Sequence, residues 1–136
     1  MNRSTLAKTS ALIVLVFAMI SLTVAAAAGG SSISLNPTVS SPSHGSTVNF
    51  SVSTTQTQPW VSVQCVQGGV TVYQQSHAYY VDPYFGGPFS DFVLTSNPSL
   101  DNSVWTSGGA SCSATLWYIA KARARTLAST TFNVLP

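Results

Sequence analysis

The strongest constraint on the fold is an alternation of apolar and polar residues that recurs along residues 47–135. The run TVNFSVS places Val48, Phe50 and Val52 on one side and hydroxyl or amide side chains on the other. The run ASCSATLWYI repeats this pattern in residues 110–119. A period of two is typical of strands with one buried face, and Ser, Thr and Val favour strands over helices. The chain is therefore predicted to be all-β.

Seven such runs are separated by segments rich in glycine, proline, serine and asparagine. Short strands at this spacing, with turn residues between them, are typical of a β-sandwich. The sequence VQCVQGGVTVY also predicts a hairpin with its turn at Gly68 and Gly69. The expected strands cover residues 31–39, 47–55, 60–66, 70–76, 89–95, 110–120 and 126–135.

The first 28 residues have a different character. Arg3 and Lys8 precede the apolar run ALIVLVFAMISLTV, and the small residues AAAAGG follow with an A-x-A pattern that ends at Ala28. This order is that of a secretory signal peptide. An uncleaved membrane anchor is the alternative, because the apolar run and the alanines together reach the lower length limit of a spanning helix. We expect cleavage of residues 1–28, secretion of a single domain formed by residues 29–136, and no membrane association after cleavage.

Charged residues are scarce in the exported part. The formal net charge of +2 comes from Arg3 and Lys8, and the remaining part has equal numbers of cations and carboxylates and no glutamate. Nucleic-acid binding requires many cations that neutralise phosphates, so no nucleic-acid partner is expected. The exported charges are those of Lys121, Arg123, Arg125, Asp82, Asp91 and Asp101.

Both cysteines, Cys65 and Cys112, lie in the exported part and on the apolar side of their expected strands. An even number of cysteines in an oxidising compartment favours a disulfide, and two separate buried thiols are the alternative. A bridge would close a loop of about 48 residues, which the chain-entropy estimate converts to roughly 4 kcal/mol of stabilisation.

The run GSTVNFSVST…WVSVQC…FVLTS…SGGASCSATL resembles the small immunoglobulin-like domains of secreted bacterial and phage proteins, across most of residues 31–136. The resemblance implies a single antiparallel β-sandwich of about seven strands. The chain departs from antibody domains, because Phe50 occupies the second strand without a cysteine and Ala110 replaces the tyrosine of the tyrosine corner. In this frame a Cys65–Cys112 bridge joins the neighbouring strands C and F and does not cross the sandwich.

The segment SHAYYVDPYFGGPFSDF, residues 76–92, gathers six aromatic residues around glycine and proline. Phe89 and Phe92 belong to the alternating strand that follows, and one or the other is most simply a core residue. The other rings lie in the connection, and tyrosine suits contacts with proteins or sugars because its ring is apolar and its tip is polar. The alternative is that the loop folds over a sheet edge and buries its rings. The candidate binding residues are Tyr79, Tyr80, Tyr84 and Phe85.

The segment KARAR holds every cation of the exported part, at Lys121, Arg123 and Arg125. It lies between the last two expected strands and is predicted to form an exposed hairpin end. In an extended segment the three side chains share one side, where they suit a phosphate, sulfate or carboxylate. The alternative is a solubilising hairpin that protects an edge strand from pairing.

No catalytic or metal-binding pattern stands out. No serine lies in a nucleophile elbow, only three aspartates are present, and His44 and His77 lack metal-ligand spacing. We therefore expect no catalytic residues, no metal and no cofactor.

The sequence favours a secreted, non-catalytic binding or adhesion module for an extracellular protein or glycan. The second hypothesis is a structural subunit of an extracellular assembly that self-associates through strand edges, with the serine-rich residues 29–43 donating a strand. A small secreted enzyme or inhibitor is the third.

Overall fold

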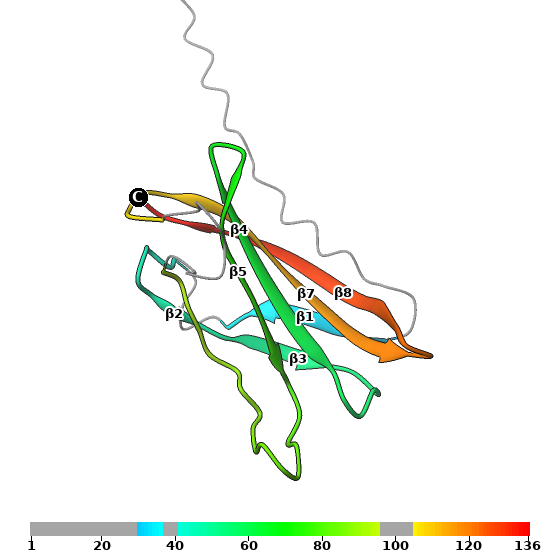
Figure 1. Ribbon diagram of the computed structural model, residues 1–136. Helices are drawn as coiled ribbons and strands as arrows, with labels where there is room; N and C mark the ends of the chain where they lie inside the picture. The colour runs from blue at the N-terminus through cyan, green and yellow to red at the C-terminus, as the bar shows by residue number, and fades with distance from the viewer. Residues whose placement is uncertain (1–29, 37–40, 96–104) are drawn as a thin grey trace, which may run out of the picture.

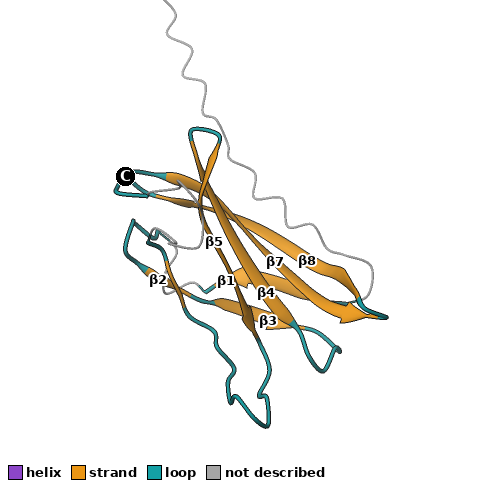
Figure 2. Cartoon of the chain, viewed as in Figure 1, coloured by secondary structure: helices purple, strands orange, loops and turns teal. Residues whose placement is uncertain are grey.

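The computed structural model describes residues 30–36, 41–95 and 105–136, and this part of the chain is all-β (Figures 1 and 2). The predicted signal peptide, residues 1–28, lies outside the described residues. Among the described residues there is no helix with the length and apolar character needed to span a membrane. The strands are β1 (Ser32–Leu35), β2 (Thr47–Val48), β3 (Phe50–Ser53), β4 (Trp60–Gln67), β5 (Val70–Ala78), β6 (Phe92–Val93), β7 (Ala110–Ala120) and β8 (Arg123–Val134).

Four long strands form the main antiparallel sheet in the order β5-β4-β7-β8. The short strands form two further antiparallel pairs, β1 with β3 and β2 with β6. Figure 1 shows these pairs as a second layer against one face of the main sheet. The arrangement is therefore sandwich-like, with the core between the two layers.

Most of the core consists of the side chains that the alternation places on the apolar side. Val61, Val63 and Cys65 of β4 are fully buried. Val48 and Phe92 face them from the short strands, where Phe50 contacts Phe92 edge to face at 5.8 Å between ring centroids. The predicted period of two is thus confirmed on both layers.

Each of the seven predicted runs contains a strand, but the described residues form eight strands and not seven. The run 47–55 is divided at Asn49, because β2 pairs with β6 whereas β3 pairs with β1. The last strand begins at Arg123 and not at residue 126, because its pairing with β7 continues to the Ala120–Arg123 pair. The run 89–95 keeps only Phe92–Val93 as a strand.

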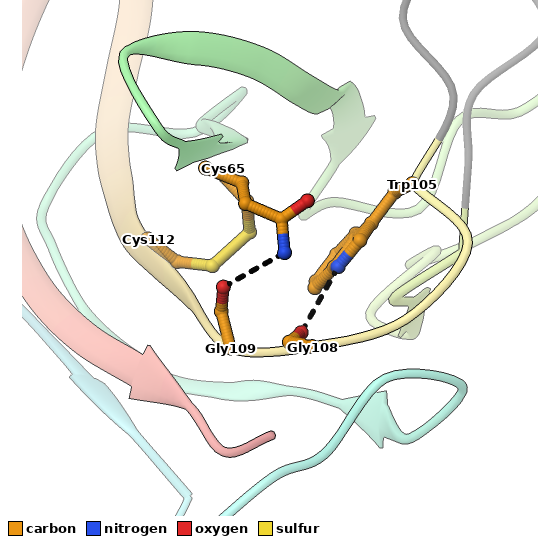
Figure 3. Close-up of a disulfide and its surroundings, with 6 residues drawn as sticks. Cys65, Trp105, Gly108, Gly109 and Cys112 are labelled. Carbon is orange, nitrogen blue, oxygen red and sulfur yellow. Dashed lines mark hydrogen bonds between the residues drawn. A yellow bond between two sulfur atoms is a disulfide. The ribbon is translucent and has the colours of Figure 1, made fainter.

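Cys65 and Cys112 form a disulfide, as predicted. They are direct partners in the register of β4 and β7, with 4.0 Å between their Cα atoms, so the bridge joins two neighbouring strands of one sheet. Trp105 is fully buried in the same part of the core (Figure 3), where its Nε1 donates a hydrogen bond to the Gly108 carbonyl oxygen at 3.2 Å. Tyr73, the register partner of Cys65 on β5, contacts this indole edge to face at 6.5 Å.

Candidate functional site

The connection between β5 and β6 forms a projecting loop, residues 79–91, which we call the aromatic finger (Figure 1). Two backbone hydrogen bonds hold its base. The Phe89 amide donates to the Ala78 carbonyl at 3.1 Å, and the Tyr79 amide donates to the Pro59 carbonyl at 2.9 Å. Near the tip, Asp82 and Gly86 exchange two backbone hydrogen bonds of 2.8 and 2.9 Å. The finger is therefore an ordered hairpin-like structure.

The carboxylate of Asp82 closes the tip. Its Oδ1 accepts hydrogen bonds from the backbone amides of Tyr84 at 2.8 Å and Phe85 at 3.0 Å. Such an aspartate turn replaces hydrogen bonds that the backbone cannot make for itself. Gly87 has a φ of 112°, and a Cβ there would lie 2.8 Å from the Tyr80 carbonyl oxygen, so the return of the chain requires glycine.

The candidate rings divide between the surface and the core. Tyr84 is 90% exposed and Phe85 is 81% exposed at the tip. Tyr80 is half-buried and contacts Trp60 edge to face at 6.1 Å. Tyr79 packs against the core, and its hydroxyl donates to the Ser90 carbonyl at 2.8 Å. Burial raises the pKa of Tyr79 to about 12. Tyr79 is thus a packing residue, and the two tip rings are the exposed members of the predicted set.

Of Phe89 and Phe92, one of which is expected in the core, the structure buries Phe92. Phe92 is fully buried, but Phe89 is 50% exposed. Residues three apart on an extended chain point to opposite sides, so the two rings cannot share one face. Phe89 instead faces a hollow beside the finger.

This hollow lies between the end of β5 and the returning arm of the finger, and its volume is about 580 Å³. The volume is within the range of sites that bind small ligands or side chains. Four of the lining residues are large aromatics, two are aspartates and none is lysine or arginine. The lining residues are Trp60, Ser76, His77, Ala78, Tyr80, Asp82, Phe85, Pro88, Phe89, Ser90 and Asp91.

His77, which the sequence suggested only as an isolated histidine, lines the hollow beside Asp91. Its ring stacks on Phe92, with 4.3 Å between centroids and 13° between planes. Burial lowers the pKa of His77, and the nearby Asp91 carboxylate and a backbone hydrogen bond to Asp91 partly oppose this. Within the described residues the buried Nδ1 has no hydrogen-bond partner. The neutral form of His77 is therefore favoured, and the two aspartates dominate the charge of the hollow.

Trp60 extends the aromatic surface onto the outer face of the main sheet. It stacks on Trp117 of β7, with 5.6 Å between centroids and 23° between planes. Trp117 Nε1 donates to Ser62 Oγ at 2.7 Å, and Ser62 Oγ lies 2.7 Å from Ser76 Oγ. The sequence analysis did not select either tryptophan. Both tryptophans lie on the polar side of alternating strands, where a large ring is unexpected. That position is the sequence pattern by which they could have been identified.

The basic segment forms a tight turn between β7 and β8. Lys121 and Ala122 have positive φ values of 49° and 61°, as expected of a two-residue hairpin turn. Arg123 pairs with Ala120 and Arg125 with Tyr118, so the two arginines share one side of β8 while Lys121 lies in the turn. All residues from Lys121 to Arg125 are exposed, as predicted. We call residues 121–125 the basic hairpin.

The aromatic finger and the basic hairpin lie at the same end of the main sheet (Figure 1). A second, smaller hollow of about 250 Å³ is lined by Tyr80 of the finger and by Tyr118 and Ile119 of β7, which precede the basic hairpin. We call this end of the molecule, with the finger, both hollows and the basic hairpin, the binding end. The smaller hollow is lined by Gln56, Thr57, Gln58, Trp60, Tyr80, Tyr118 and Ile119.

Within residues 30–36, 41–95 and 105–136, no group of three or more histidine, cysteine or acidic side chains is placed to hold a metal ion. The binding end instead offers aromatic faces, two carboxylates, hydroxyls and an exposed basic turn. No protein-family model, curated protein or solved structure matches the chain.

Proposed function

We propose that the chain is a secreted, non-catalytic binding module, and that its binding end attaches to an extracellular protein or glycan. The observation that carries this proposal is the exposure of Tyr84 and Phe85 on a tip that Asp82 already holds in place. Large apolar rings are usually buried, so two exposed rings on one tip indicate a contact surface. Because hydrogen bonds already hold the tip, binding a partner costs little conformational entropy in this loop. The aromatic hollow beside the tip adds concave contact area.

An immunoglobulin-like connection of the strands is part of the proposal. Residues 47–53 pair with β1 at one end and with β6 at the other, which corresponds to an A-B-E layer. The main sheet then corresponds to the strands C′-C-F-G, with the disulfide between C and F. A parallel bridge between Ser43 and Leu135, next to the last strand, supports the same interpretation.

Secretion is supported by the disulfide, because such bonds persist in oxidising compartments. Intact-mass measurement on the mature protein tests it. A mass that corresponds to cleavage near Ala28 is expected in the medium or on the cell exterior. A full-length mass in the membrane fraction would exclude cleavage and favour the anchor.

Binding is tested on a glycan array and against labelled proteins extracted from cell surfaces. The wild type is compared with the Tyr84→Ser, Phe85→Ser double variant. This variant should lose ligands that the wild type retains. Val70→Ser is the matched control, because Val70 is also an exposed apolar residue but lies at the opposite end of β5. Equal binding by the wild type and the double variant would exclude the finger tip as the binding site.

A structural subunit is the second candidate, and the long edge strands β5 and β8 of the main sheet favour it. The suggested donor segment, however, is partly in use, because Ser32–Leu35 pairs with β3 of the same chain. Edge-to-edge assembly should therefore depend on β5 or β8. Ser129→Pro in β8 should disrupt assembly through the edge of β8 but not assembly through the binding end. Light scattering of this variant measures its assembly and distinguishes the two routes.

A further inference from the structure

Within the described part of the chain, the charged side chains lie on two separate surfaces. The basic hairpin carries all its cations, whereas Asp82 and Asp91 line the larger hollow. Among the described residues, no lysine or arginine lines that hollow, so its carboxylates have no cationic side chain of these residues beside them. Separated charges of opposite sign favour association between copies and determine their orientation.

We propose that the larger hollow binds the basic hairpin of a second copy of this chain. The inference rests on the proposed function, because it names a partner for the same binding end. The contact places an arginine or lysine head group among the aromatic rings and beside the carboxylates.

The chemistry of the hollow suits a guanidinium group. Trp60 and Tyr80 meet at an interplanar angle of 71°, so they form two walls of different orientation. Arginine stacks on aromatic faces and forms paired hydrogen bonds with carboxylates. Asp82 Oδ1 already accepts two amide hydrogen bonds, but a carboxylate has a second oxygen that can accept from a guanidinium.

The basic hairpin suits the role of the inserted element. Its two-residue turn is narrow, and Arg123 and Arg125 project from one side of β8 at a spacing of about 7 Å, which is two residues of extended chain. Three adjacent cations repel one another in the free molecule, and the carboxylates of a partner relieve that repulsion.

The position of the two elements predicts the symmetry. Both lie at the same end of the molecule, so a two-fold axis lets each copy insert its hairpin into the hollow of the other. Five of the eight large hydrophobic residues that are exposed in the described chain lie at this end and would lose solvent contact in the pair. These five are Val81, Tyr84, Phe85, Phe89 and Ile119.

Sedimentation equilibrium of the mature protein at 0.05 and 0.5 M NaCl tests the proposal. A dimer is expected at low salt, with dimerisation at least about tenfold weaker at high salt, because salt screens exposed charges. A monomer at every concentration up to about 1 mM at low salt would overturn the proposal.

Two variants locate the contact. The hollow variant, Asp82→Asn with Asp91→Asn, removes both charges but keeps a carbonyl oxygen for the hydrogen bonds from Tyr84, Phe85 and Asn49. The hairpin variant changes Lys121, Arg123 and Arg125 to Gln. Each variant alone should be monomeric. A dimer that persists in both would assign association to another surface.

Mixing the two variants is the decisive measurement. The intact hairpin of the hollow variant fits the intact hollow of the hairpin variant, so the mixture should form heterodimers although neither protein self-associates. Failure of the mixture to associate would contradict the hairpin–hollow contact. The control changes Val70 and Ser111, both exposed at the opposite end of the main sheet, to Lys, which alters net charge as much as the hollow variant does. It should still dimerise.

The glycan and protein binding assays with Tyr84→Ser, Phe85→Ser keep the two proposals separate. A monomeric wild type that binds a ligand through its tip would leave the binding function standing and exclude the second copy as partner. No ligand binding by the wild type in these assays, with dimerisation intact, would restrict the function to self-association.

Discussion

Asp82 Oδ1 accepts a hydrogen bond from the Tyr84 amide at 2.8 Å, so a partly exposed carboxylate holds the backbone of a residue whose ring is 90% exposed. The relationship explains how a segment rich in glycine and proline presents two rings without collapsing onto the sheet. The tip is fixed by a carboxylate and not by the packing of its own rings.

Replacing Asp82 by Ala should therefore loosen the tip without unfolding the domain. A hydrogen bond to a charged group contributes a net free energy of about 1.5 to 3 kcal/mol, and the loss is confined to the tip. Faster amide hydrogen exchange at Tyr84 and Phe85 should be seen by NMR, with strand amides unchanged. Asp82→Asn, which keeps an acceptor oxygen, is the control. Unchanged exchange in Asp82→Ala would show that the tip does not depend on this carboxylate.

The aromatic rings of the finger should differ sharply in their effect on stability. Tyr84→Ser with Phe85→Ser removes exposed rings and should change the free energy of unfolding by no more than about 0.5 kcal/mol. Tyr79→Ser removes a ring that packs against the core and should cost at least about 2 kcal/mol. Urea denaturation of the two variants measures both values. Similar losses in both would place the tip rings in the core.

Removing the disulfide with Cys65→Ala and Cys112→Ala should cost about 2 to 5 kcal/mol, the range for native bridges in small secreted domains. The bridge closes a loop with a sequence separation of 47 residues. Peptide mapping without reductant should recover the linked pair, and calorimetry should give the loss. Two thiols that react with iodoacetamide in the native protein would contradict the structure.

The buried hydroxyl of Tyr79 should ionise late. Burial raises its pKa to about 12 in the folded chain from an ordinary value of 10.0, so the unfolded chain releases this proton first as the pH rises. The part of the free energy of unfolding that depends on the neutral Tyr79 hydroxyl is then complete below pH 10 and is lost as the pH rises through about 12. The difference in absorbance at 295 nm between the wild type and Tyr79→Phe should show a titration near pH 12. A midpoint near 10 would mean that the ring is solvated.

His77 should make the domain less stable in mild acid. Burial is the main cause that lowers its folded pKa below 6.5, so between these two values the unfolded chain binds more protons than the folded chain. The free energy of unfolding must therefore fall as the pH decreases through 6.5. Asp91, the charged group beside the ring, reduces the effect but does not reverse it. Thermal melts at pH 5 and 7 should show a smaller difference for His77→Gln, and an unchanged difference would exclude His77 as the cause.

The period of two was sufficient to predict the all-β chain and most of its core. Val48, Phe50, Val61 and Val63 lie on the predicted buried side, and both cysteines lie there with them. The division at Asn49 was not predictable, because strands that pair with β6 or with β1 have the same alternation. Pairing partners far apart in sequence leave no local pattern.

The candidate site was predicted in composition but not in arrangement. The sequence identified the aromatic segment and the basic turn, but it did not distinguish Tyr79 from Tyr84. Tyr79 directly follows β5, and its amide is held by Pro59, so its ring packs against the core, whereas Tyr84 lies at a turn apex. That difference depends on contacts with another strand. Trp60 and Trp117 were missed because their stacking requires the register of β4 and β7.

The cross-strand bridge has a mechanical consequence for the aromatic finger. Tension applied between the two ends of the chain passes through the covalent link from Cys65 to Cys112 and bypasses the residues between them. The aromatic finger and its tip lie inside this bypassed segment, so a pulling force that strips β1 or β8 from the domain does not extend the finger. Tension would therefore reach the finger only through its contacts with residues outside that segment, such as Pro59 and Trp60.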